Sequence, residues 1–197
     1  MADNLSIDRR TSALLVMDFQ MLIVDNYADD AKALLNRTAK LIAAVRTAGM
    51  RVIYVVVGFR PGHPEVSDRN ATFKGLKASG AFAAGAESGK IHPAVAPLIE
   101  EIVVTKHRVS AFAGTDLDLI LRANGIETLI LTGIITSGVV LSTLRHAADA
   151  DYRLLVVRDC CSDRDEETHR VLLEKVFPWQ ATITTAAELE QAIGARR

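Results

Sequence analysis

Short runs of apolar residues alternate along the chain with longer segments in which apolar residues recur every three or four positions. Six of these short runs are five to seven residues long and rich in Val, Ile and Leu, a composition typical of buried strands. They lie at residues 13–18, 51–57, 101–106, 128–133, 153–159 and 181–185. Because most runs are apolar at consecutive positions, we expect strands that are buried on both faces, as in a parallel sheet.

The segments between the runs have the spacing of amphipathic helices. In residues 29–49, the apolar residues Leu34, Leu41 and Val45 share one face, and Gly49 is placed to end the helix. Further helices are expected at residues 115–125, 137–151 and 164–177 and from Ala186 onwards.

This alternation predicts an α/β fold of three layers, with a six-stranded parallel sheet between two layers of helices. We expect a single domain over residues 1–197, because no linker or internal repeat interrupts the pattern. The exception to the regular rhythm is the segment 58–100, which holds four of the five prolines. A stretch of that length without clear elements is usually functional or mobile.

Composition and charge narrow the class of protein. Hydrophobic residues make up 49% of the chain, charged residues 24%, and the net charge is −1, so neither nucleic acid nor an anionic membrane is expected as a partner. No apolar run approaches the roughly 18 residues of a membrane span, and the N-terminus lacks the apolar core of a secretory signal. The adjacent Cys160 and Cys161 are poorly placed to pair. Together these features predict a cytoplasmic protein.

Candidate chemistry follows from the strand ends, since ligands of open parallel sheets bind beyond the carboxyl ends of the strands. The residues after the expected strands include carboxylates, several cations and a turn of small residues: Asp18, Phe19, Gln20, Arg60, Lys106, Arg108, the turn 134–139 and Asp159. An Asp in such a place often only caps a turn, and a Lys there is often only solvated. Apposed to each other, Lys106 would hold Asp18 ionised or shift its pKa.

Four blocks of sequence, in order, resemble those of the isochorismatase-like hydrolases, a superfamily that includes cysteine amidohydrolases. The blocks are LLVMDFQ, VVTKHRVSAFAGTDL, LILTGIITSGVVLSTLRHAAD and RDCCSD. The resemblance implies a three-layer α/β/α fold with strand order 3-2-1-4-5-6. In the amidohydrolase branch it implies a catalytic Asp–Lys–Cys triad. The Asp matches Asp18, the Lys matches Lys106, and the Cys position is occupied by Val139.

Val139 is the main departure from the family pattern. A valine has no lone pair, so a covalent thioester route is closed at this position. Cys160 and Cys161 follow the fifth expected strand rather than the fourth, and we do not expect either to replace the thiol. The isochorismatases also lack this Cys, and they hydrolyse a vinyl ether, which needs an acid and a water. Asp18 would serve as that acid if apolar surroundings raise its pKa.

The resemblance also implies roles for the turn and its neighbours. In the family the peptide before the Thr, here Ile135–Thr136, is typically cis. The turn would direct N–H groups near residues 138–139 at a ligand as an oxyanion hole; its residues are Ile135, Thr136, Ser137 and Gly138. The strand ends and nearby loops, rather than the resemblance, supply the candidate substrate-binding residues Phe19, Gln20, Arg60, Arg108 and Phe112. Phe112 would either line a pocket for a flat substrate or seal the core. With Lys106, the two arginines would suit a dicarboxylate.

No metal and no cofactor are expected, because the loop after the second strand holds only His63 and a metal site needs three or more ligands. The acidic run 163–167 is interpreted as the solvated start of a helix, and His169 as a surface or packed residue. The leading hypothesis is a hydrolase that cleaves a vinyl ether or a C–N bond of a small metabolite, with Asp18 as general acid/base and Lys106 as its partner. The alternative is a non-catalytic member that binds a small metabolite or a protein. The family pattern suggests a homodimer or homotetramer.

Overall fold

The computed structural model describes residues 5–28 and 30–194. Its centre is a parallel sheet of six strands in the order β3-β2-β1-β4-β5-β6. The strands are β1 (Ser12–Met17), β2 (Arg51–Val57), β3 (Ile102–Lys106), β4 (Thr128–Ile134), β5 (Arg153–Ser162) and β6 (Thr182–Thr184). The predicted α/β class and the strand order implied by the resemblance are both confirmed.

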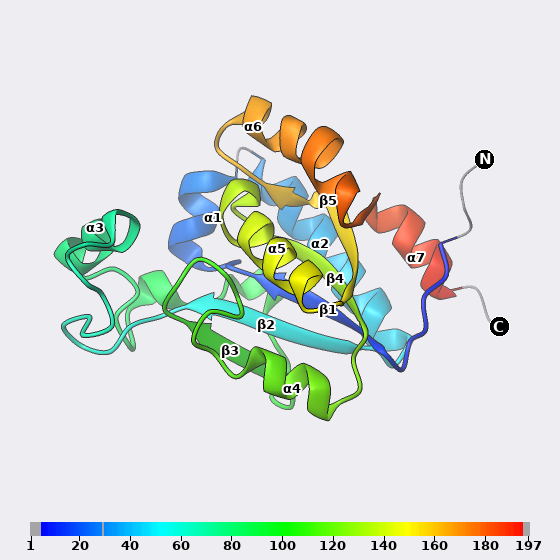
Figure 1. Ribbon diagram of the computed structural model, residues 1–197, viewed down its shortest axis with the longest axis horizontal. Helices are drawn as coiled ribbons and strands as arrows, with labels where there is room; N and C mark the ends of the chain where they lie inside the picture. The colour runs from blue at the N-terminus through cyan, green and yellow to red at the C-terminus, as the bar shows by residue number, and fades with distance from the viewer. Residues whose placement is uncertain (1–4, 29, 195–197) are drawn as a thin grey trace.

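Helices cover both faces of this sheet (Figure 1). The α-helices are α1 (Met21–Tyr27), α2 (Ala31–Thr47), α3 (Ala71–Ser79), α4 (Leu117–Ala123), α5 (Leu141–Asp149), α6 (Glu166–Val171) and α7 (Ala186–Gly194). Shorter helical turns are Glu87–Gly89, Pro93–Val95, Thr136–Val140, Leu172–Val176 and Phe177–Trp179. Helices α1, α2 and α7 pack on one face, and α4, α5 and the segment after α6 pack on the other. Asp29, where the second helix was predicted to start, lies outside the described residues, as do the first four and last three residues of the predicted domain.

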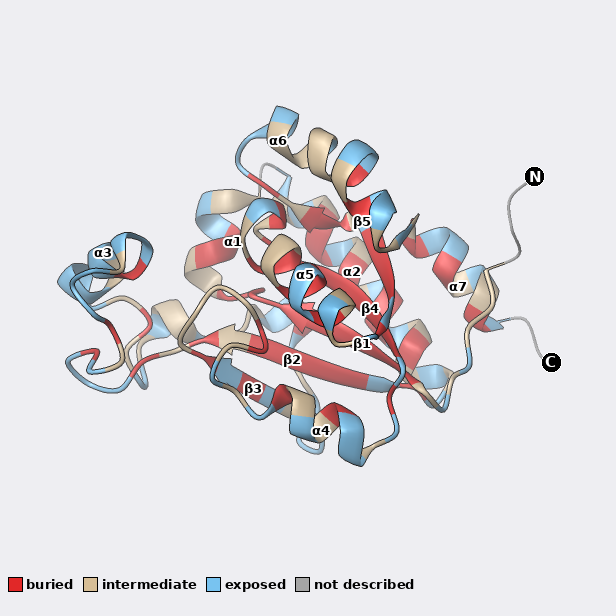
Figure 2. Ribbon diagram, in the orientation of Figure 1, coloured by how far each residue is buried: buried red, intermediate tan, exposed pale blue. Residues whose placement is uncertain are grey.

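The sheet separates two apolar cores. On β1, Leu14 and Val16 belong to the core under α2 and α7, whereas Leu15 and Met17 belong to the core under α4 and α5. Figure 2 shows the inner strands β1, β2, β4 and β5 buried along most of their length, which is what consecutive apolar residues indicate. The edge strands β3 and β6 are partly exposed. Among the described residues, no helix combines the length and apolar character needed to cross a bilayer.

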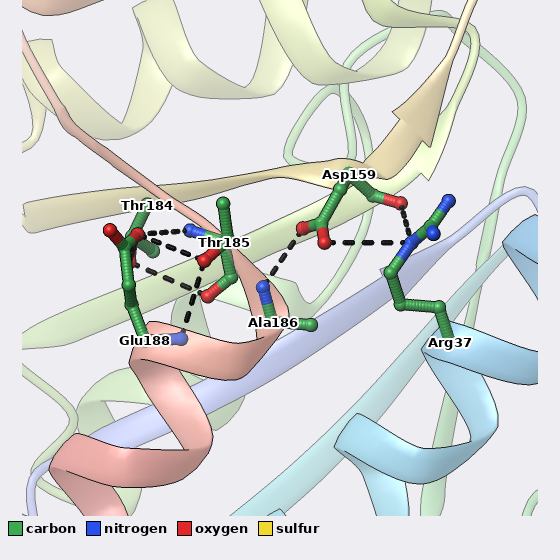
Figure 3. Close-up of polar contacts among 6 residues, drawn as sticks. All are labelled: Arg37, Asp159, Thr184, Thr185, Ala186 and Glu188. Atoms are coloured by element: carbon green, nitrogen blue, oxygen red, sulfur yellow. Dashed lines mark hydrogen bonds and ion pairs between the residues drawn. The ribbon is translucent and has the colours of Figure 1, made fainter.

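Helix α7 is fixed to the sheet through its first turn (Figure 3). Asp159 on β5 accepts a hydrogen bond from the Ala186 N–H at 2.8 Å, and its carbonyl accepts one from Arg37 Nε at 2.6 Å. Thr185 and Glu188 form a capping box, in which the Thr185 N–H donates to Glu188 Oε2 at 2.8 Å and the Glu188 N–H donates to Thr185 Oγ1 at 3.3 Å. Asp159 therefore does not end its strand at the ligand edge, because β5 continues to Ser162.

The segment 58–100 is more regular than the sequence pattern indicated. It contains α3, which lies apart from the sheet (Figure 1). Ring centroids of Phe59 lie 4.8 Å from His63 and 5.8 Å from Phe73, and Phe59 and Phe73 belong to the core under α2 and α7. Asn70 caps α3 by accepting from the Phe73 N–H, and Gly80 ends it with φ of +68°. The helix was missed because Phe73 is its only buried residue.

Candidate functional site

An ion pair between Asp18 and Lys106 forms the centre of the candidate site. Lys106 Nζ lies 2.9 Å from Asp18 Oδ2, and the two side chains are 3% and 8% exposed respectively. Asp18 follows β1 and Lys106 ends β3, so β2 lies between them and the gap is about 10 Å at the usual strand spacing. The long lysine side chain spans this gap, and its Nζ also donates to the Arg108 carbonyl at 3.2 Å.

The backbone at Asp18 has an uncommon conformation. Its φ is +61°, and its N–H donates to the Val55 carbonyl at 2.8 Å. Left-handed conformations are disfavoured for residues with a Cβ, although Asp and Asn tolerate them better than most, and they typically cost about 1–3 kcal/mol. Strain of this kind persists where the surroundings fix it and is concentrated at functional sites.

Two opposing influences act on the Asp18 carboxyl. Burial raises its pKa above the ordinary value, and the ammonium of Lys106 lowers it through charge and hydrogen bonding, with burial the larger influence. In the described part of the chain, Asp18 Oδ1 is buried and has no hydrogen-bond partner. Leaving a buried acceptor unpaired costs about 1–3 kcal/mol, so this atom is suited to hold a proton or to meet a ligand.

The turn after β4 lies beside this pair. Thr136–Val140 form a single π-helical turn, a feature often found at functional sites. Gly133 pairs with Met17, the residue before the carboxylate, and a Cβ on Gly133 would lie only 3.0 Å from the Met17 carbonyl oxygen. A Cβ on Gly138 would lie 4.0 Å from Val109 Cγ1, in the loop after β3. The turn therefore approaches the ends of both strands that supply the ion pair.

One prediction about this turn changes in detail. The cis peptide bond joins Ile134 to Ile135, one position before the Ile135–Thr136 bond that the resemblance implied. Since β4 ends at Ile134, this bond joins the strand to the turn. Val139, at the position of the family nucleophile, is buried and belongs to the core under α4 and α5.

Three N–H groups of the turn already have acceptors within the protein. Ser137 donates to Asp163 Oδ2 at 2.7 Å, and Gly138 and Val140 donate to the Ile135 carbonyl at 3.0 and 3.3 Å. An oxyanion hole that uses Ser137 or Gly138 would need these bonds to be exchanged for bonds to a ligand. The oxyanion role of residues 138–139 stays a prediction.

The cysteines are unsuited to replace the missing thiol. Cys160 belongs to the core under α2 and α7, and Cys161 to the core under α4 and α5. Burial raises the pKa of the Cys160 thiol to about 12 and also raises the pKa of the Cys161 thiol. Since the thiolate is the nucleophile, thiols that stay protonated at neutral pH are inert.

Phe19 and Gln20 directly follow Asp18 at the end of β1. Phe19 is buried in the core under α2 and α7. The Gln20 amide nitrogen donates to the carbonyls of Val57 and Gly89, each at 2.8 Å, and its oxygen accepts from the Val57 N–H at 2.8 Å. Both amide protons are therefore engaged with the backbone, and Gln20 links the end of β1 to β2 and to the turn Glu87–Gly89. Its role in substrate binding stays a prediction.

The cations predicted to bind a dicarboxylate, Arg60, Lys106 and Arg108, each have partners within the protein. Arg60 is 70% exposed, and its Nη1 lies 2.6 Å from Glu65 Oε1. Arg108 donates to the carbonyls of His107 and Glu65 at 2.6 and 3.0 Å. Because Arg60 and Lys106 each have a carboxylate partner, the structure gives less support to a dicarboxylate substrate than the sequence did.

Phe112 packs against His146 on α5. Its ring is stacked on His146, with centroids 4.6 Å apart and an interplanar angle of 2°. In the described ranges, no three His, Cys, Asp or Glu side chains are grouped so that they would hold a metal ion.

Two residues near the turn were missed as candidates. Asp163 is only 9% exposed and accepts from the Ser137 N–H. His169 Nδ1 lies 2.8 Å from Thr136 Oγ1. The strand-end rule would have found Asp163, but the fifth strand was predicted to end at Asp159, three residues before its end at Ser162.

A three-layer parallel α/β fold with a buried Asp–Lys pair beside the turn after β4 defines the class of isochorismatase-like hydrolases. Residues 12–188 match the family model described as the isochorismatase domain. The chain belongs to the isochorismatase family.

Relatives match over nearly the whole chain. An uncharacterized isochorismatase family protein of Escherichia coli O157:H7, YecD, is 31% identical over 192 residues, covering 96% of this chain and 100% of its own. Maleamate amidohydrolase of Pseudomonas putida is 28% identical over 188 residues, covering 93% of this chain and 87% of its own. The crystal structure of a cysteine hydrolase from Pseudomonas syringae pv. phaseolicola has a TM-score of 0.88 at 22% identity, covering 98% of this chain and 99% of that one. At that identity the likeness shows the fold.

Proposed function

We propose that the protein hydrolyses a small metabolite at the sheet edge where Asp18 and Lys106 meet, without a covalent intermediate on a thiol. One observation carries the proposal: a buried carboxylate has one oxygen 2.9 Å from an ammonium and the other without a partner. Membership of the isochorismatase family supports hydrolysis. The name of the maleamate amidohydrolase relative supports a small amide as one candidate substrate.

For a vinyl ether, Asp18 acts as a general acid. Its raised pKa favours the protonated form, and the unpartnered Oδ1 is the oxygen free to carry the proton. The proton passes to the enol carbon, water adds to the resulting oxocarbenium carbon, and the proton released from that water returns to Asp18. The hemiketal then collapses to a carbonyl compound and an alcohol. General acid catalysis of this kind typically contributes about 10²–10⁴-fold to the rate.

For an amide, ionised Asp18 acts as a general base. It takes a proton from the water that attacks the carbonyl carbon, and it delivers that proton to the leaving nitrogen when the C–N bond breaks. Lys106 holds Oδ2 in place in both reactions and helps to keep the ionised form in the second. Because the pair is buried, a substrate that reaches Oδ1 must displace side chains of the surrounding loops.

A screen against small vinyl ethers and amides, maleamate included, tests the proposal. Asp18→Asn is the test variant, since Asn tolerates the left-handed backbone. Asp25→Asn on the exposed face of α1 is the matched control. We expect Asp18→Asn to lower kcat/KM by about 10²-fold or more, with Asp25→Asn unchanged. Turnover by Asp18→Asn at the unmodified rate would remove the proposal.

A non-catalytic binding role is the second candidate. It is favoured by the turn, where the N–H groups of Ser137 and Gly138 are already engaged within the protein. This role predicts that small acids or amides raise the unfolding temperature of the protein without being turned over.

A further inference from the structure

We propose that Asp163 and His169 are positioning residues that hold the turn Thr136–Val140 in place at the ligand edge of the sheet. Both follow β5; His169 contacts Thr136, the first residue of the turn, and Asp163 contacts Ser137, the second. The proposal rests on the proposed function only in so far as this turn is part of the reacting site. We call the contacts of Asp163 and His169 with the turn the clamp; its effect on the turn is measurable without a substrate.

Asp163 binds the backbone of the turn through a hydrogen bond. Its Oδ2 accepts from the Ser137 N–H at 2.7 Å, and its Oδ1 accepts from the Asp165 N–H at 3.4 Å. The residue is nearly buried, so the short bond is protected from competing water, and bonds from N–H groups to an ionised carboxylate are stronger than neutral ones. Asp163 is thus part of the site, whereas the rest of the acidic run 164–167 is exposed as the sequence predicted.

His169 contacts the side chain of Thr136, the residue before Ser137. Thr136 is fully buried, and its Oγ1 lies 2.8 Å from His169 Nδ1 and 3.1 Å from the Ser162 carbonyl. A carbonyl only accepts, so the single hydroxyl proton is donated to Ser162. His169 must then donate through Nδ1–H, which fixes its tautomer when the ring is neutral. Burial lowers the pKa of His169, with the charge of Asp163 opposing that change.

The clamp depends on an irregularity in the sheet. The register of β4 and β5 shifts between Leu131 and Gly133, so Gly133 pairs with Cys161 and Ile134 pairs with Ser162. The extra length of β5 brings Asp163 level with the turn. Asp163 does not cap the following helix, because Asp165 caps α6 by accepting from the N–H groups of Glu167 and Thr168. The main contact of Asp163 is with the turn.

Asp163→Ala and Asp165→Ala form a matched pair. Each removes a carboxylate that accepts two backbone N–H groups, but only the first touches the turn. The measurement is amide hydrogen exchange of peptides covering residues 134–141 and 165–171. We expect Asp163→Ala to accelerate exchange in the turn by about tenfold or more, and Asp165→Ala to accelerate exchange only in α6. Equal exchange of the turn in the two variants would overturn the proposal.

Three further variants cover the case in which Asp163→Ala does not fold. Asp163→Asn keeps an oxygen acceptor without the charge, and we expect about a threefold acceleration in the turn. His169→Asn keeps a donor near the Nδ1 position, whereas His169→Ala does not, so exchange of the turn should be normal in the first and faster in the second. An unaffected turn in Asp163→Asn and His169→Ala would refute the clamp.

Kinetics on a substrate identified in the screen separates the clamp from the proposed function. Asp163→Ala should lower kcat by about tenfold with KM nearly unchanged, because orientation is lost rather than binding, and Asp165→Ala should change neither. Loosened exchange with an unchanged kcat would overturn the positioning role. If Asp18→Asn keeps full activity while Asp163→Ala loosens the turn, the proposed function fails and the clamp stands.

Discussion

Lys106→Met removes the ammonium 2.9 Å from Asp18 and leaves that carboxylate buried without a counterion. Breaking a buried ion pair in this way typically costs about 3–5 kcal/mol, a large part of the roughly 5–15 kcal/mol that stabilises most domains. Removing both charges with Asp18→Asn and Lys106→Met together should restore about 2 kcal/mol or more, because no uncompensated charge remains in the interior. The change in unfolding free energy of the double variant, minus the sum of the changes of Asp18→Asn and Lys106→Met alone, is the coupling energy between the two side chains.

Urea denaturation at pH 7 measures these free energies. Far-UV circular dichroism is the better probe, because the single tryptophan, Trp179, is 86% exposed. Arg122→Gln is the control: Arg122 Nε lies 2.8 Å from Asp118 Oδ2, but both side chains are well exposed, so no measurable loss is expected. A loss below about 1 kcal/mol in Lys106→Met, or no recovery in the double variant, would refute the view that burial controls this pair.

Three further predictions follow from the same geometry. Val139→Cys should acquire amidase activity, measured as ammonia release, if the turn and the pair are intact, whereas the same change in an Asp18→Asn background should not. Folding raises the pKa of Asp18, so the folded state binds this proton more tightly than the unfolded chain and stability declines as pH rises above about 4. Asp18→Asn should reduce that decline in urea midpoints between pH 4 and 7, and an unchanged slope would contradict the raised pKa. Asp159→Ala should lower the free energy of unfolding by about 0.5–2 kcal/mol, because the first turn of α7 loses its acceptor for the Ala186 N–H; hydrogen exchange in α7 that stays slow would contradict this.

The sheet and the ion pair were accessible from sequence because their signals are local. Runs of consecutive apolar residues mark strands buried on both faces, and the strand-end rule then selects Asp18 and Lys106. Their meeting across β2 depends on the reach of a lysine side chain, which a pattern does not contain. The structure supplies that contact.

Other features depend on tertiary contacts that leave no periodic signal. Gln20 reads as a polar residue at a strand end, yet its amide is engaged with the backbone of two other segments. The shift of register between β4 and β5 is invisible in the apolar pattern, and it moves the end of β5 from Asp159 to Ser162. As a result Asp163 was assigned to a solvated helix start, although its carboxylate lies nearly buried beside the turn.

The dependence of kcat/KM on pH, compared between the unmodified protein and Lys106→Met, tests most directly whether Asp18 is the proton-transferring group. The profile reports the pKa of the essential group in the free enzyme. Lys106 is the influence that lowers the pKa of Asp18 against burial, so the account predicts that the limb belonging to Asp18 moves to higher pH in Lys106→Met. A limb that stays at the same pH would contradict it, because the titrating group would then not be the carboxylate beside Lys106.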